Sequence, residues 1–218
     1  MKKALVLSLA VILAACSDAT APIPDATPQP GGRRPAAGAA DPILVYQANF
    51  NVGTVGGEWS SNKLSLTPTG ERFLGDFLNE QVGLLVIMPP HSQIVIEADV
   101  YFIRTWDGTD TQWGPDTFNM GVDATTLVNT TISTVNANQN YPYSVGGLEV
   151  SAGTGALASN TLGYTYWAEL VPEDATYRFS YTVNHTSPVA FIHWQASGLQ
   201  YLADESWGLD NIRISYNP

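Results

Sequence analysis

Apolar and polar residues alternate with a period of two along much of the chain beyond residue 40. In residues 94–102 every even position is apolar, and in residues 177–183 every odd position is apolar. Successive side chains of a β-strand point to opposite faces, so this alternation is typical of strands with one buried face and one wet face. The two segments therefore predict long, half-buried strands.

Further strands are expected wherever short apolar or alternating runs are separated by Gly, Pro and Asn. The unbroken apolar run 84–88 predicts a strand covered on both faces. No internal repeat is found, and no segment predicts a helix. The other expected strands are 43–48, 63–67, 117–122, 125–133, 156–166, 189–196 and 209–216. About ten strands without helices predict an all-β fold, an antiparallel β-sandwich of jelly-roll type.

The first 15 residues predict a signal peptide. Lys2 and Lys3 precede an apolar run at 4–13 that is too short to remain as a membrane-spanning helix. The sequence Leu-Ala-Ala-Cys ending at Cys16 resembles the lipobox of bacterial lipoproteins, and Cys16 is the only cysteine of the chain. The resemblance implies lipidation of Cys16 and anchoring to a membrane, and Ser17 after it favours the outer membrane. The alternative is an ordinary secretory signal with a chance cysteine.

Residues 16–40 are rich in Pro, Ala and Gly and hold too little apolar mass for a core, so they predict a disordered linker. Residues 41–218 (218 − 40 = 178) then form one domain, long enough for a sizeable core.

The net charge argues against a nucleic-acid partner, and the cysteine content excludes a disulfide framework. The net charge of −11 becomes −13 once Lys2 and Lys3 are removed with the signal peptide, so nucleic acid is not an expected partner. A single cysteine excludes an intrachain disulfide. The acidic surface suits cations instead.

Several stretches resemble a group of exported bacterial domains of uncharacterised function. They are IVIEADVYFIRTWDG at 94–108, GPDTF at 114–118, TTIS at 130–133, NTLGY at 160–164 and DESWGLDNI at 204–212. The last of these also resembles the closing strand of concanavalin A-like and MAM-like sandwiches. The resemblance implies a concanavalin A-like jelly roll. This fold is shared by lectins, adhesion modules, glycosidases and purely structural domains, so it does not identify a function.

Carboxylates near strand ends predict a structural Ca²⁺ site. By even spacing, Asp116 shares a face with Phe118, and Asp210 shares one with Ile212. A carboxylate on a core-facing side requires compensation, and hard oxygen ligands suit Ca²⁺. Four more acidic residues lie in the adjoining loops or near the last strand, namely Asp107, Asp110, Asp204 and Glu205.

The resemblance to jelly rolls adds to this prediction, because such proteins often hold Ca²⁺ through an Asp at the start of the final strand, the place of Asp210. The alternative is that Asp116 and Asp210 accept backbone N–H bonds at turns.

Aromatic residues predicted in loops or at strand ends are candidates for ligand binding. Trp106, Trp113 and Tyr141 could stack on sugar rings while neighbouring polar groups bond hydroxyls. The alternative is that such residues close the ends of the sandwich, which is the expected role of Trp207.

Catalytic signals are weak. Glu97 and Asp99 resemble part of the E-x-D-x-x-E motif of concanavalin A-like glucanases, but Phe102 replaces the third carboxylate. No catalytic residue is therefore assigned. We expect a non-catalytic binding, adhesion or scaffold module of the cell envelope that recognises a glycan or an envelope protein. The alternative is a divergent glycoside hydrolase.

Overall fold

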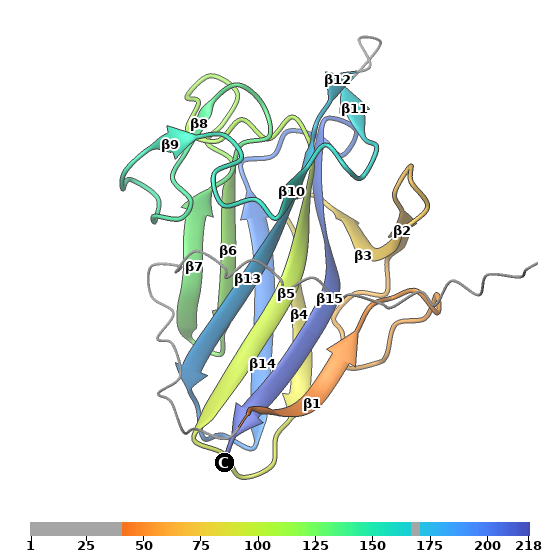
Figure 1. Ribbon diagram of the computed structural model, residues 1–218, viewed down its shortest axis with the longest axis vertical. Helices are drawn as coiled ribbons and strands as arrows, with labels where there is room; N and C mark the ends of the chain where they lie inside the picture. Colours follow the sequence, from red (N-terminus) through yellow and green to blue (C-terminus); the bar gives the residue numbers. More distant parts are fainter. Residues whose placement is uncertain (1–40, 167–170) are drawn as a thin grey trace, which may run out of the picture.

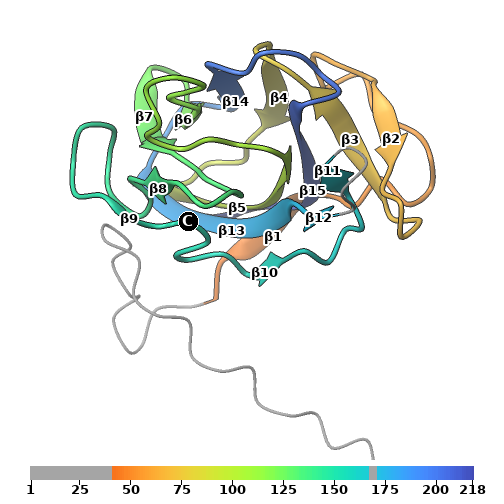
Figure 2. The same ribbon diagram turned by 90° about the horizontal axis from the view of Figure 1, so that it is seen from above.

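The computed structural model describes residues 41–166 and 171–218, which form a two-layer antiparallel β-sandwich (Figures 1 and 2). The predicted all-β sandwich of jelly-roll type is thus confirmed, while the concanavalin A-like subtype stays a prediction. The predicted signal peptide and linker, with Cys16, lie outside the described residues. Within the described ranges no helix has the length and hydrophobicity needed to cross a bilayer.

The larger sheet has the order β10-β13-β5-β15-β3-β2, and β1 pairs with the second half of β15. Its strands are β1 (Ile43–Ala48), β2 (Leu64–Leu66), β3 (Arg72–Phe77), β5 (Gln93–Arg104), β10 (Ala158–Ser159), β13 (Asp174–Asn184) and β15 (Glu205–Asn217). The long strands β13, β5 and β15 lie side by side over the height of the molecule (Figure 1).

The smaller sheet has the order β4-β14-β6-β7 and faces the larger one across the core, as the view from above shows (Figure 2). Its strands are β4 (Gln81–Ile87), β6 (Thr117–Val122), β7 (Thr125–Thr131) and β14 (Val189–Ser197). Two small ribbons complete the described fold: β8 (Asn138–Gln139) with β9 (Val150–Ser151), and β11 (Thr165–Tyr166) with β12 (Val171–Pro172).

The core lies between the sheets and follows the predicted alternation. The even-numbered apolar residues of β5 are at most 1% exposed, and Tyr177 and Phe179 of β13 are fully buried. The odd-numbered residues of β5 and the even-numbered residues of β13 point away from this core. The register between β5 and β13 runs without a break from Gln93 to Ile103, which is why a strict period of two predicted both strands correctly.

Two predicted strands differ from the structure. The segment 156–166 is divided into β10 and β11, because Asn160 and Gly163 adopt positive φ angles of 60° and 86° that interrupt an extended chain. The apolar run 84–88 is not covered on both faces. It belongs to β4 at the edge of the smaller sheet, where Leu85 and Ile87 remain exposed.

The last strand contains the irregularity that matters most for the site. Asp210 pairs with Asp99, but the next register pair is Arg213 with Glu97, so β15 advances three residues while β5 advances two. Asn211 takes a φ of 50° at this β-bulge. The bulge also marks the point where the partner of β15 changes from β3 to β1.

Candidate functional site

Three acidic side chains converge at the end of the sandwich where β5 finishes and β15 begins. Asp107 follows β5, Asp116 directly precedes β6, and Glu205 is the first residue of β15. One carboxylate oxygen from each lies within 4.8 Å of the other two. Asp116 and Glu205 are fully buried, whereas Asp107 is partly exposed. We refer to these three residues as the acidic triad.

The protein only partly satisfies these buried carboxylates. The backbone N–H of Asp107 donates to Asp116, and the N–H of Gln200 donates to Glu205 Oε2 at 2.9 Å. Asp116 Oδ1 and Glu205 Oε1 are buried without a hydrogen-bond partner. Among the described residues, no Lys, Arg or His forms an ion pair with the triad. Such uncompensated negative charge is costly in the interior.

The electrostatics of the triad reflect this shortage of positive charge. Burial, reinforced by the charges of Asp110 and Asp204, raises the pKa of Asp107 to about 6. Burial is also the main cause that raises the pKa values of Asp116 and Glu205, and each is raised further by the charges of neighbouring carboxylates. Without a cation, the triad therefore tends to retain protons.

The donor set fits Ca²⁺. Ca²⁺ binds oxygen ligands at ~2.3–2.6 Å, so two oxygens on one ion lie at most ~5 Å apart. The spacing of the triad satisfies that limit. Asp116 Oδ1 and Glu205 Oε1 are also the orphaned atoms that an ion at this place would satisfy.

Asp110 and Asp204 lie beside the triad and not in it. Asp110 accepts N–H bonds from Gln112 and Trp113, which lower its pKa. Asp204 accepts a hydrogen bond from Thr105 Oγ1 at 2.8 Å. Both carboxylates contribute negative charge near the triad, while Oδ1 of each accepts hydrogen bonds from other groups.

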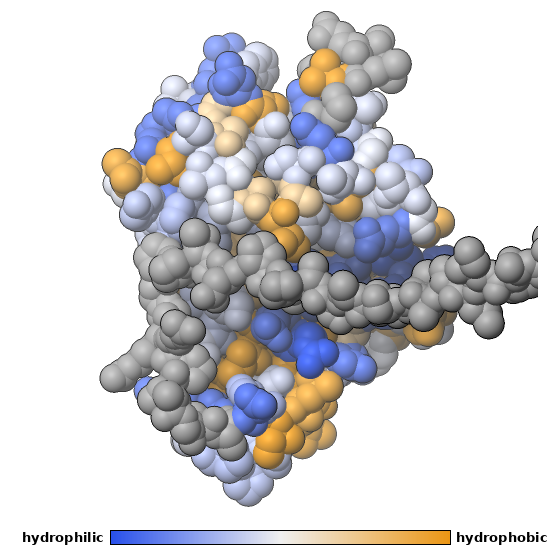
Figure 3. Space-filling model, viewed as in Figure 1, coloured by the Kyte–Doolittle hydropathy of each residue, from blue (hydrophilic) through white to orange (hydrophobic). Residues whose placement is uncertain are grey.

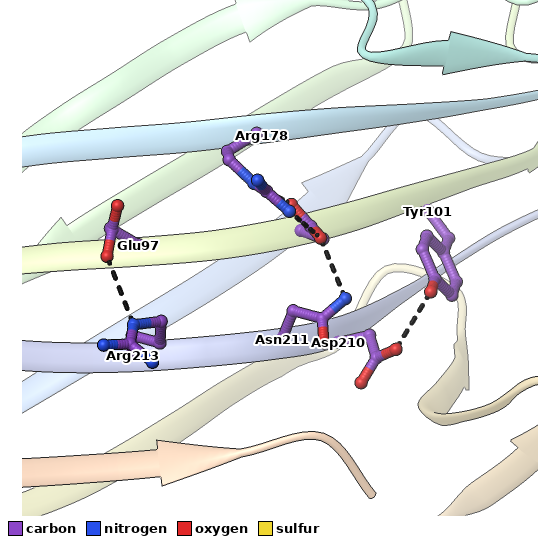
Figure 4. Close-up of polar contacts among 7 residues, drawn as sticks. Glu97, Tyr101, Arg178, Asp210, Asn211 and Arg213 are labelled. Carbon is purple, nitrogen blue, oxygen red and sulfur yellow. Dashed lines mark hydrogen bonds and ion pairs between the residues drawn. The ribbon is translucent and has the colours of Figure 1, made fainter. Parts of the chain in front are cut away.

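The inferred orientation of Asp210 is wrong. The bulge at Asn211 breaks the even spacing, so Asp210 lies opposite Asp99 on the outer face of the sheet, while Ile212 faces the core. Its Oδ2 accepts a hydrogen bond from the Tyr101 hydroxyl at 3.0 Å (Figure 4). Burial raises the pKa of Asp210 to about 6. Asp210 is not part of the acidic triad.

The structure also corrects two of the three aromatic candidates. Trp106 is fully buried and donates its indole N–H to the carbonyl of Ser206 at 2.8 Å. Tyr141 is 4% exposed and packs against Tyr177 and Phe179. Both belong to the core and cannot stack on a ligand. Trp113 remains exposed, at 59%.

The two carboxylates of the glucanase-like fragment are held in ion pairs. Arg178 binds both oxygens of the buried Asp99 at 2.7 Å, and Asn211 donates to Asp99 Oδ2 at 3.0 Å. Glu97 pairs with Arg213 at 3.6 Å. Figure 4 shows these contacts along the outer face of the larger sheet. With Phe102 in the core, no third carboxylate completes the motif.

A hollow of about 420 Å³ opens beside the bulge of β15, between that strand and the segment after β1. We call it the Tyr46 hollow. Trp59 forms part of its wall, donates its indole N–H to the Tyr46 hydroxyl at 2.7 Å and stacks on Trp194. The Tyr46 hydroxyl in turn donates to Glu58 at 2.9 Å. The polar residues that line the hollow are Tyr46, Gln47, Asn49, Thr54, Glu58, Asn211 and Arg213.

The Tyr46 hollow continues along the sheet. A second hollow of about 340 Å³ is lined by Glu97, Arg178, Asn211 and Arg213, so the two share Asn211 and Arg213. Over β5 and β15 the space-filling view shows a band of strongly hydrophilic residues with hydrophobic residues below it (Figure 3). Sequence reasoning missed this region, because its residues are widely separated in the chain and meet only through the bulge.

No family model matches the chain, and no curated protein sequence matches it. Among solved structures, it is similar to a carbohydrate binding module (CBM6cm-2) from Cellvibrio mixtus lichenase 5A in complex with cellotriose. The TM-score is 0.36 and the identity 12%, covering 81% of this chain and 100% of that one.

Two other solved structures show comparable similarity. The C-terminal CBM6 of LamC, a marine laminarinase from Zobellia galactanivorans, matches with a TM-score of 0.35 and 12% identity over 78% of this chain and 98% of that chain. Dimeric latent PorU from Porphyromonas gingivalis matches with a TM-score of 0.41 and 10% identity over 86% of this chain but 14% of its own. At these values, neither residue roles nor ligands transfer to this chain.

Proposed function

We propose that this domain is a non-catalytic binding module for an extended, neutral oligosaccharide, displayed on the cell envelope. The Tyr46 hollow is the observation that carries the proposal. Its volume of about 420 Å³ falls in the ~300–1,000 Å³ range of small-molecule sites. Its continuation along β15 offers length for more than one sugar unit.

The chemistry of the lining supports a sugar ligand. The partly exposed Tyr46 gives the hollow an aromatic surface, with the buried Trp59 packed beside it, and the carboxylate, amide and guanidinium groups of Glu58, Asn211 and Arg213 can bond hydroxyls. Charges of both signs line the two hollows, so a strongly anionic or cationic ligand gains little there. A neutral ligand with many hydroxyl groups uses the available donors and acceptors best.

The hydrolase alternative receives no support from this geometry. A retaining or inverting glycosidase needs one carboxylic acid and one carboxylate facing the same bond. Asp99 is instead buried under Arg178 and Asn211, and Glu97 faces Arg213. These carboxylates hold the sheet and the bulge together.

We further propose that Ca²⁺ occupies the acidic triad as a structural ion. The ion would neutralise Asp116 and Glu205 and tie the loop after β5 to the start of β15. Its role there is stability, because the triad and the Tyr46 hollow have no lining residue in common.

Glu58→Gln is expected to weaken oligosaccharide binding by roughly tenfold or more, since a hydrogen bond to a charged group contributes ~1.5–3 kcal/mol. The substitution keeps the side-chain shape and removes the charge. A printed array of neutral oligosaccharides would identify a ligand for the wild-type protein, and calorimetry would then compare the variant.

Trp113→Ala is the matched control, because Trp113 is the exposed aromatic of the predicted set and does not line the hollow. It should leave affinity unchanged. The proposed site would be contradicted if the wild-type protein bound no oligosaccharide on the array. It would also be contradicted if Trp113→Ala abolished binding while Glu58→Gln retained it.

Anchoring through Cys16 is proposed from the sequence alone. Cys16→Ala is expected to abolish labelling by a radioactive fatty acid and to shift the protein from the membrane to the soluble or unprocessed fraction, because the thiol that accepts the lipid is missing. Ser17→Ala leaves that thiol in place and should keep the label. Label retained after Cys16→Ala would refute the lipoprotein assignment.

A further inference from the structure

Two of the three histidines of the chain meet at the opposite end of the sandwich from the acidic triad. His91 lies in the turn between β4 and β5, and His185 lies directly after β13. Asp123, in the turn between β6 and β7, completes the group. All three turns lie at the end of the molecule where β15 finishes (Figure 1). The proposed oligosaccharide site does not use these residues.

In each histidine ring, the nitrogen that points away from the other ring contacts a hydrogen-bond acceptor. His91 Nδ1 lies 2.6 Å from the carbonyl oxygen of Pro89, and His185 Nε2 lies 3.0 Å from Asp123 Oδ2. A carbonyl or an ionised carboxylate cannot donate, so each of these nitrogens must carry the hydrogen. Asp123 is held in place in turn, because its Oδ1 accepts the N–H of Phe191 at 3.0 Å.

The two inward-facing nitrogens then face each other. His91 Nε2 and His185 Nδ1 are 2.6 Å apart, and the rings are inclined by only 17° with centroids 4.9 Å apart. The rings therefore meet edge to edge, with their lone pairs directed at one another. Two neutral imidazoles carry two hydrogens, and both are used by Pro89 and Asp123. Two bare lone pairs at this distance repel unless a cation lies between them.

We propose that His91 Nε2 and His185 Nδ1 bind a divalent transition-metal ion of the Zn²⁺, Cu²⁺ or Ni²⁺ class. Imidazole nitrogen suits these ions, whereas Ca²⁺ prefers oxygen. The acceptors behind the rings are those that orient metal-binding histidines in general, a carboxylate for one ring and a backbone carbonyl for the other. Asp123 and the Pro89 carbonyl are thus positioning groups that fix which nitrogen of each ring is bare.

The geometry admits an ion after a small movement. Zn–N bonds of ~2.0–2.1 Å in a tetrahedral site require the two nitrogens to be roughly 3.3 Å apart, an opening of less than about 1 Å, together with a tilt of the His91 ring that turns both lone pairs toward the ion. His91 is only partly buried, while the His185 side chain is 7% exposed, so His91 is the ring that can shift. Water would supply the remaining ligands from the open side.

The test is a calorimetric titration of the purified protein with Zn²⁺ in millimolar Ca²⁺, which keeps the acidic triad occupied. One Zn²⁺ per chain is expected. His91→Ala and His185→Ala should each lower the affinity by more than the roughly 10–100-fold typical of losing a supporting contact, and Asp123→Asn by about that amount. Asn tolerates the positive φ of 50° at this position, so the turn is retained.

His193→Ala is the matched control, because the third histidine lies on the smaller sheet with its ring over Gly121. It should leave Zn²⁺ binding unchanged. Imidazole ¹⁵N NMR should report metal bound to Nε2 of His91 and Nδ1 of His185. The proposal would be overturned if Zn²⁺ did not bind and a single proton were shared between these two nitrogens. It would also be overturned if His193→Ala abolished Zn²⁺ binding while His91→Ala retained it.

Discussion

Glu205→Gln is expected to abolish the rise in melting temperature that Ca²⁺ gives to the wild-type protein. An ion that binds only the native state stabilises it by RT ln(1 + [L]/Kd), ~2.7 kcal/mol at a hundredfold excess over Kd. For a domain of this size, that corresponds to a shift of roughly 5–10 °C. Gln still accepts the N–H of Gln200 but supplies no charge to the ion. Thermal melts in EDTA and in millimolar Ca²⁺ measure the difference.

Asp210→Asn is the matched control for this experiment. Asp210 is as buried as Asp116 and Glu205, but it lies on the outer face of the larger sheet against Tyr101. Its substitution should leave the Ca²⁺-dependent shift intact. Identical wild-type melts in EDTA and Ca²⁺ would show that no stabilising ion binds the triad.

The same melts have an expected pH dependence in EDTA. Unfolded carboxyl groups titrate near pH ~4, whereas burial raises the pKa of Asp107 to about 6 and raises those of Asp116 and Glu205 as well. Between the unfolded and the folded pKa values the folded state binds more protons than the unfolded state, so stability falls as the pH rises from about 4 through about 6, and it continues to fall until Asp116 and Glu205 have also lost their protons. Saturating Ca²⁺ should remove the contribution of the triad to this decline, because the ion replaces the protons, whereas the contribution of Asp210, whose pKa burial raises to about 6, should remain.

The strands were predictable from sequence where pairing is regular. Residues 94–102 and 177–183 lie on neighbouring strands in an unbroken register, so a strict period of two identified the buried face of each. Asp116 was likewise placed correctly on the inner side, since β6 continues from it without a bulge before Phe118. In these strands the regular alternation of side chains is enough to determine which face of the sheet each residue occupies.

Sequence reasoning failed where one residue changes the register. The φ of 50° at Asn211 shifts β15 by one position, and this moves Asp210 to the opposite face from the one its spacing predicts. Asn and Asp are the non-glycine residues that most often adopt positive φ. An Asp-Asn pair inside a predicted strand is therefore a signal that even spacing need not hold beyond it.

The ligand-binding region could not be predicted for a different reason. Burial of an aromatic residue depends on what folds over it, and Trp106 and Tyr141 are covered by segments far away in the chain. The Tyr46 hollow joins the segment after β1 to the bulge of β15, more than 150 residues later. Neither segment carries a motif that indicates a site.

Phe102→Ala is expected to destabilise the domain by about 3–5 kcal/mol, a large part of the ~5–15 kcal/mol that holds a typical domain folded. The Phe102 ring is fully buried, with centroids 4.7 Å from Trp106, 5.1 Å from Phe118 and 5.3 Å from Tyr177. Because Phe118 belongs to the other sheet, the substitution leaves a cavity between the layers. Urea unfolding and thermal melts should show it, with a melting temperature lower by roughly 6–20 °C.

Phe102→Glu extends this prediction to the enzyme alternative. The substitution restores the missing carboxylate of the glucanase-like motif, but an odd spacing of five residues from Glu97 on a regular strand points it into the core. We therefore expect loss of folding and no hydrolysis of β-glucans, whereas exposed Trp113→Ala should change stability by less than about 0.5 kcal/mol. A folded Phe102→Glu protein that cleaves a glucan would show that this face of β5 can turn outward, and would revive the hydrolase assignment.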